Sequence, residues 1–174
     1  MALKQSVGDA PSSVTAAEWT SAVDELVAAS RAARAPHRLV LLLFLVSRAH
    51  RNQGARVSFA EVEASISPAL QITARAAKPE PMLPFWHLQS SPFWRVENAD
   101  ALPRRKGKDR PTRRGLLEAD VYGLVPAEWW TILLDSSELR ATLMSTLLEA
   151  ISDSQSIRDQ VARILNVSQP GVDQ

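Results

Sequence analysis

HRLVLLLFLVSRAHRNQ, residues 37 to 53, is the stretch of the sequence that decides the fold. All residues from Leu39 to Val46 are apolar, which predicts a helix that is buried on most of its faces and central to the domain. Pro36 suits the first turn of such a helix, and Gly54 suits its end. The apolar run is too short to cross a bilayer, so it indicates a core and not a membrane anchor.

The composition is that of an ordinary globular protein. The chain has 174 residues, of which 45% are hydrophobic and 22% are charged, enough for one well-buried core. It contains no cysteine, which excludes disulfides and thiolate metal sites and fits an intracellular setting. We therefore expect a soluble, cytoplasmic protein with no membrane partner.

Helix signals occur along most of the chain. Thr15 with Glu18, and Ser58 with Glu61, have the spacing of capping boxes, and Asp135 with Ser136 can cap a third helix. Apolar residues follow these signals at helical spacing. The predicted helices cover about residues 15–34, 36–53, 58–76 (bent or broken near Pro68), 115–123, 126–134, 136–151 and 156–167.

One aromatic stretch departs from this pattern. In LPFWHLQSSPFWRVE, residues 83–97, Pro-Phe-Trp occurs twice. The pattern predicts a β-hairpin with arms 85–89 and 93–97 and a turn at 90–92, with Trp94 facing the core. Such a ribbon either fills the core or forms a contact surface. The predicted fold is thus mainly α, a helical bundle-like domain with one small β-hairpin and a basic loop.

The basic loop is PRRKGKDRPTRRG, residues 103–115. It holds seven basic residues and one acid, a local charge of +6, so the rest of the chain carries 1 − 6 = −5. This asymmetry indicates an anionic partner, and arginines can bind phosphate oxygens bidentately. The expected contacts to a nucleic-acid backbone are Arg104, Arg105, Lys106, Lys108, Arg110, Arg113 and Arg114.

Signals for catalysis are few. His37, His50 and His87 stand alone, without the spacing of a metal site. The sequence has no HExxH, phosphate-binding glycine loop or GxSxG motif. We expect no catalytic residues, metal or cofactor, and the residues alone favour a nucleic-acid-binding module or a protein-interaction domain.

Three segments carry a resemblance to a known family. APHRLVLLLFL (35–45), PFWHLQSSPFW (84–94) and LLDSSELRATLMSTLLEAIS (133–152) occur in the order found in one family. Over about residues 14–165 the chain resembles the sulfur-binding domain of phosphorothioate-dependent, McrA-type HNH restriction endonucleases. The resemblance implies binding of double-stranded DNA in which sulfur replaces a non-bridging phosphate oxygen, as the targeting module of a modification-dependent restriction endonuclease in bacterial defence.

The resemblance also implies a site. Sulfur is a poorer hydrogen-bond acceptor than oxygen and gains from an apolar pocket, in which an ordinary phosphate oxygen would lose its water without replacement. Trp86 and His87 fall where the sulfur pocket and the phosphate contact of the family meet. The family often has an arginine at the position of His87, and an imidazole there would make the phosphate contact shorter and sensitive to pH. The implied DNA- and sulfur-binding residues are Pro84, Phe85, Trp86, His87, Gln89, Ile151 and Ser152, with His37 and Arg38 at the backbone. Ile151 and Ser152 stand where the family usually has an aromatic residue and proline.

The expected organisation is a disordered leader over 1–12, the sulfur-binding domain over 13–166, and a linker or tail over 167–174. No histidine follows residue 150, so the paired histidines of an HNH nuclease are missing. We expect this chain to bind and not to cut, and a full-length protein to carry a possible C-terminal HNH nuclease domain. The alternatives are a general nucleic-acid-binding module without sulfur preference and a protein-interaction domain.

Overall fold

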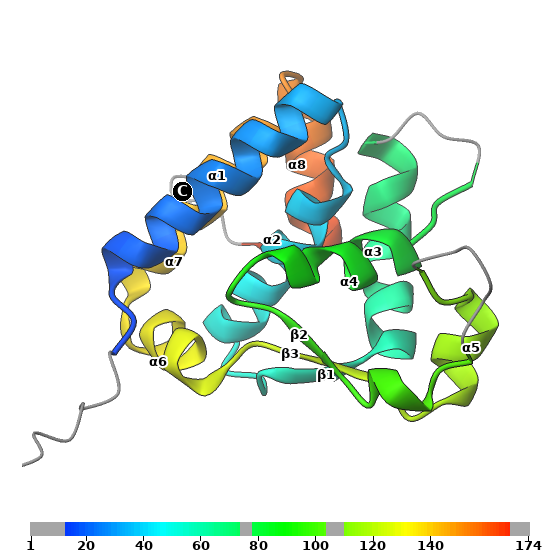
Figure 1. Ribbon diagram of the computed structural model, residues 1–174. Coiled ribbons are helices and arrows are strands. Elements are labelled where there is room, and N and C mark those ends of the chain that lie inside the picture. The colour runs from blue at the N-terminus through cyan, green and yellow to red at the C-terminus, as the bar shows by residue number, and fades with distance from the viewer. Residues whose placement is uncertain (1–12, 74–77, 104–109, 168–174) are drawn as a thin grey trace, which may run out of the picture.

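The computed structural model describes residues 13–73, 78–103 and 110–167 (Figure 1). Within these ranges the fold is mainly α-helical with one small antiparallel sheet, which confirms the predicted fold class. The helices are α1 (Ala16–Ala33), α2 (His37–His50), α3 (Phe59–Thr73), α4 (Met82–His87), α5 (Arg113–Glu118), α6 (Ala127–Asp135), α7 (Ser137–Ile151) and α8 (Gln155–Ile164). The strands are β1 (Arg56–Ser58), β2 (Arg95–Glu97) and β3 (Tyr122–Leu124), and short 3-10 turns occur at η1 (Leu88–Ser90) and η2 (Ala99–Ala101).

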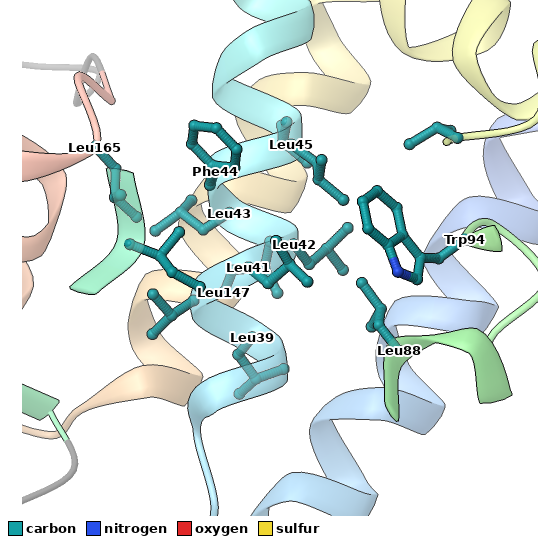
Figure 2. Packing of buried hydrophobic residues seen from close by; sticks show 14 of the residues in the cluster. Leu39, Leu41, Leu42, Leu43, Phe44, Leu45, Leu88, Trp94, Leu147 and Leu165 are labelled. Carbon is teal, nitrogen blue, oxygen red and sulfur yellow. The ribbon is translucent and has the colours of Figure 1, made fainter. Parts of the chain in front are cut away.

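Helix α2 lies at the centre of the core, as its apolar run predicts. Every residue from Leu39 to Ala49 is buried, and the helix contacts α1, α3, α4, α6 and α7. Figure 2 shows apolar side chains of α2 packed among Leu88, Trp94 and Leu147. At its C-terminal end, the Ser47 hydroxyl donates to the carbonyl oxygen of Leu165 at 2.7 Å, so this buried polar group is satisfied. The core therefore fixes both the position and the direction of α2, and with them the place of its N-terminus.

The helix starts follow the predicted caps. The Thr15 hydroxyl accepts from the Glu18 N–H, and the Glu18 carboxylate accepts from the Thr15 N–H, so the first capping box is complete. Ser58 accepts from the Glu61 N–H at 3.2 Å, but the Glu61 carboxylate pairs with the Arg48 guanidinium. Local polar side chains thus set these boundaries.

The predicted break at Pro68 is absent, because α3 continues through this residue to Thr73. A proline cannot donate to the carbonyl four residues earlier, here that of Ala64. Both Pro68 and Ala64 are exposed, so water can bond to the orphaned carbonyl and the helix can continue.

The aromatic stretch is the main correction to the sequence analysis. Residues 82–90 form α4 and η1, not the first arm of a hairpin. A strand would have placed His87 and Gln89 on the same side as Phe85. The helical turn instead buries Pro84, Phe85 and Leu88 together and leaves the two polar residues exposed. The helical spacing of the apolar residues in this segment therefore decides its structure, although its aromatic composition is typical of a strand.

The second arm of the predicted hairpin does form a strand, but with a different partner. Strand β2 pairs with β3, and β3 pairs with β1, in the order β1-β3-β2. In this register Gly123 lies opposite both Val57 and Val96. The predicted helix over 115–123 is correspondingly shorter, because α5 ends at Glu118 and residues 122–124 join the sheet.

Buried aromatics attach α4 to the rest of the core. Trp94 is 1% exposed, as its predicted inward orientation requires, and Phe93 is buried as well. The Trp94 Nε1–H donates to the Phe85 carbonyl oxygen at 2.8 Å, and the Phe85 ring packs edge-on against Trp94 and Phe59. The aromatic stretch therefore fills the core in large part, and by doing so it positions α4 beside the N-terminus of α2.

Candidate nucleic-acid interface

A cationic pocket lies where the N-terminus of α2 meets α4. Its volume is about 530 Å³. Three separate segments of the chain line it: the turn before α2 with the first residues of α2, the helix α4 with η1, and the end of the basic loop. The lining residues are Ala35, His37, Arg38, Leu83, His87, Ser90 and Arg110. We call this the α2–α4 pocket.

One side-chain contact links the two helical sides of the α2–α4 pocket. The Ser90 hydroxyl donates to the His87 carbonyl oxygen at 3.1 Å and accepts a longer contact of 3.5 Å from an Arg38 guanidinium nitrogen. Beneath them Phe85 and Leu88 are fully buried. The pocket side of α4 is thus held from below by apolar packing and from the side by Ser90.

The charges of the α2–α4 pocket are not neutralised from within. Among the described residues, no carboxylate forms an ion pair with Arg38 or Arg110. The two other described arginines of the basic segment differ. Arg113 bonds to both oxygens of Glu63 at 2.5 and 2.7 Å, and Arg114 pairs with Glu118 at 2.6 Å. Arg113 and Arg114 are therefore paired with carboxylates of the protein, whereas Arg38 and Arg110 have no such partner among the described residues.

Burial and neighbouring charges both act on the imidazole of His37. Burial lowers the pKa of its imidazole below the usual 6.5, and the charges of Arg38 and His87 lower it further, while Glu80 acts in the opposite direction. Burial, reinforced by the neighbouring cations, therefore disfavours the protonated form of His37 in the folded protein.

The lowered pKa of His37 predicts a pH-dependent stability. Below pH 6.5 the unfolded chain protonates this imidazole more readily than the folded protein does. The free energy of unfolding should therefore fall as the pH drops from 6.5 toward the lower pKa of the folded state, and His37→Gln should remove this part of the decline. Denaturant unfolding on both sides of this range measures the effect. His50→Gln, at an exposed histidine, is the control, and equal pH profiles for His37→Gln and wild type would contradict the prediction.

The other residues implied at the site lie elsewhere or inside the core. Pro84 and Phe85 lie on the buried face of α4, and Trp86 is partly buried against the core; none of the three lines the α2–α4 pocket. Gln89 is exposed, and its amide donates to the Trp86 carbonyl oxygen at 2.9 Å. The residues Arg104, Arg105, Lys106 and Lys108 are outside the described ranges.

Ile151 and Ser152 are not part of the α2–α4 pocket either. Ile151 is 7% exposed and lines a different hollow, between α1, α2, α3 and α7. Ser152 follows the end of α7, where its hydroxyl accepts from the Ser154 N–H and its carbonyl accepts from Arg158. Both residues therefore have local structural contacts of their own.

Three residues of the pocket are not among the predicted site residues: Ala35, Leu83 and Ser90. Ala35 and Leu83 each directly precede a proline in a motif that was recognised. Leu83, His87 and Ser90 also have the spacing i, i+4, i+7 of one helical face. Had residues 83–90 been assigned to a helix, this periodicity would have placed the three together opposite the buried face.

Other kinds of site find no support in the part of the chain that the structure describes. There, no group of three or more histidine, cysteine, aspartate or glutamate side chains is arranged to hold a metal ion. Likewise, no helix within those ranges is both long and apolar enough to span a membrane.

The described part of the chain is a helical domain whose α2–α4 pocket places two arginines and two imidazoles beside an aliphatic wall. The chain belongs to the family of ScoMcrA-like DNA sulfur-binding domains, whose family model matches residues 17–164. The resemblance seen in three sequence motifs is thereby confirmed. No curated protein matches the chain.

Solved structures share the fold. The sulfur-binding domain of ScoMcrA, complexed with phosphorothioated DNA, has a TM-score of 0.63 at 20% identity, over 74% of this chain and 85% of that one. The corresponding domain of SprMcrA, also complexed with phosphorothioated DNA, has a TM-score of 0.60 at 20% identity, over 75% and 80%. In the phosphorothioation-dependent restriction endonuclease ScoMcrA, the matching part spans 27% of that chain, at a TM-score of 0.67 and 20% identity.

Proposed function

We propose that this domain binds double-stranded DNA that carries a phosphorothioate linkage, and that the α2–α4 pocket receives the modified phosphate. The observation that carries the proposal is the composition of the pocket: cations that pair with no carboxylate among the described residues, beside an aliphatic wall, in a member of the sulfur-binding family. Phosphorothioated DNA bound to structurally similar domains adds support.

Each side of the pocket has a chemical role in this proposal. Arg38 and Arg110 neutralise the charge of the phosphate and donate to its remaining oxygens, with His37 and His87 beside them. Leu83 and the Ala35 methyl group form the surface on which sulfur rests. An ordinary phosphate oxygen placed there would lose water and gain no hydrogen bond, so this surface discriminates against unmodified DNA.

The domain would act as a targeting module. It locates modified DNA, and cleavage belongs to an HNH nuclease domain elsewhere in a full-length protein. The family description supports a binding role for this chain. The four basic residues at 104–106 and 108 extend the positive charge next to Arg110 along the sequence, and we propose that they contact further phosphates of the duplex.

Leu83→Ser tests the sulfur-binding surface. The variant keeps all the cations of the pocket but replaces the apolar wall with a hydroxyl that can bond to oxygen. We expect the preference for phosphorothioate over ordinary duplex to fall about tenfold, or ~1.4 kcal/mol, mainly through weaker binding of the modified DNA. Titrations of both duplexes with wild type and variant measure the ratio.

Leu117→Ser is the matched control, because Leu117 is 40% exposed on α5 and does not line the pocket. It should leave the ratio unchanged. Equal losses of affinity for both duplexes in Leu83→Ser would contradict a sulfur contact at this residue and would favour a module that reads only the DNA backbone.

A further inference from the structure

A second hollow adjoins the turn that precedes α2. Its volume is about 220 Å³, several times the ~30 Å³ that a water molecule occupies in the liquid. It is lined by Ser30, Arg31 and Arg34 from the end of α1, and by Ala35, which also lines the α2–α4 pocket. Because the two hollows share Ala35, they are neighbours on the molecule. We call this one the Arg34 pocket.

The polar groups of the Arg34 pocket suit an anion. Arg31 and Arg34 are exposed, and within the described ranges neither forms an ion pair with a carboxylate. The Ser30 side chain is 2% exposed, and its hydroxyl has no hydrogen-bond partner among the described residues. The Thr73 hydroxyl differs, since it already donates to the Ala69 carbonyl oxygen at 2.9 Å. The pocket thus combines two guanidinium groups with one unused hydroxyl donor.

An unsatisfied buried hydroxyl is unusual in a native protein, because it loses its water without replacement. A ligand oxygen that enters between Arg31 and Arg34 can supply the missing acceptor. Phosphate is the anion for which arginine is best suited, since its planar group bonds to two oxygens at once. A continuous DNA strand that places one phosphate in the α2–α4 pocket brings the phosphates beside it close to the turn at Ala35.

We infer that the Arg34 pocket binds an unmodified phosphate of the same DNA strand, next to the phosphate held in the α2–α4 pocket. This inference rests on the proposed function. It assigns to Arg31, Arg34 and Ser30 a contact that is independent of sulfur. The Arg34 pocket therefore contributes affinity and register on the strand, while the α2–α4 pocket contributes the preference for the modification.

The backbone of Arg34 permits a clean test. Arg34 has a φ of 51°, in the left-handed region, where it ends α1 and its N–H donates to the Arg31 carbonyl oxygen. Glycine is favoured at such a position. Arg34→Gly should therefore remove the guanidinium without lowering the melting temperature, so that a loss of binding in this variant does not come from unfolding.

The main measurement is the affinity of wild type and Arg34→Gly for matched phosphorothioate and ordinary duplexes over a range of salt. We expect affinity for both to fall by similar factors, about three- to tenfold, and the log–log salt slope to decrease by about 0.9. The ratio between the two duplexes should not change. Ser30→Ala should weaken binding in the same uniform way with an unchanged or higher melting temperature.

Arg51→Ala is the control for charge alone. Arg51 is exposed at the other end of α2, roughly 20 Å from the pocket, since a helix rises about 1.5 Å per residue. It should affect affinity and salt slope less than Arg34→Gly does. Equal effects of the two variants would overturn the inference, because they would mean that Arg34 acts only through the general attraction between positive charge and DNA.

Neutral methylphosphonate linkages locate the contact. They are placed one at a time near the phosphorothioate, and each duplex is titrated with wild type and Arg34→Gly. At one position the methylphosphonate should lower the affinity of wild type but not that of Arg34→Gly. If the methylphosphonate and the substitution lower the affinity additively at every position, the inference is overturned. If wild type does not prefer phosphorothioate at all, the proposed function fails, but the salt slope on ordinary duplex still tests the Arg34 pocket.

Discussion

Replacing Arg38 by alanine is expected to weaken binding of phosphorothioate duplex by about 2–4 kcal/mol, roughly 30- to 1,000-fold. Arg38 lies in the first turn of the buried helix α2, in the α2–α4 pocket, and the one contact of its side chain described above is the long contact with Ser90. No carboxylate in the described part of the chain pairs with this guanidinium, so its charge is available to a phosphate. Arg38→Lys should recover only part of the affinity, because an ammonium group keeps the charge but not the bidentate geometry.

Arg113→Ala is the informative comparison, since both arginines were sequence candidates for a phosphate contact. Arg113 bonds to both carboxylate oxygens of Glu63, so it is less available to DNA. We expect its loss to reduce affinity much less than the loss of Arg38. Titrations of the two variants, with melting curves for each, decide the matter. A larger loss of binding in Arg113→Ala would move the site from the α2–α4 pocket to α5.

Replacing Gly123 by alanine is expected to lower the free energy of unfolding by about 3 kcal/mol or more, the upper range for an overfilled core. A Cβ atom at this position would lie 2.0 Å from two ring carbons of Trp94. The indole has no room to withdraw, because it is 1% exposed and its N–H is bonded to the Phe85 carbonyl oxygen. The substitution therefore forces apart the sheet and α4.

Gly54→Ala provides the control for Gly123→Ala, because no atom lies within 4 Å of a Cβ built at Gly54. It should change the free energy of unfolding little. Denaturant unfolding of both variants measures the difference. Similar stabilities for the two variants would mean that Trp94 does not pack on Gly123 as described, and that another contact holds α4 in place.

The parts of the fold that depend on local sequence could be predicted. The apolar run of α2, the capping box at Thr15 and the cap at Ser58 are signals contained within a few residues, and the structure has each of them. The family could be recognised for a similar reason, since its three motifs are short and keep their order along the chain.

The parts that depend on contacts between distant segments could not be predicted. Strand β3 pairs with β1 and β2 far from it in sequence, and nothing near Gly123 indicates that Trp94 covers it. The α2–α4 pocket joins three segments in the same way. The pairing of Arg113 with Glu63 depends on the packing of α5 beside α3, so a count of charges in the basic loop could not identify which arginine is free.

One measurement tests the central claim most directly: a titration of the wild-type domain with two duplexes of the same sequence that differ in a single sulfur. We predict tighter binding of the phosphorothioate duplex by at least about tenfold, or ~1.4 kcal/mol, at the same salt concentration. Equal affinity for the two duplexes would contradict the account and leave a general DNA-binding module, and no binding to either would leave a protein-interaction domain.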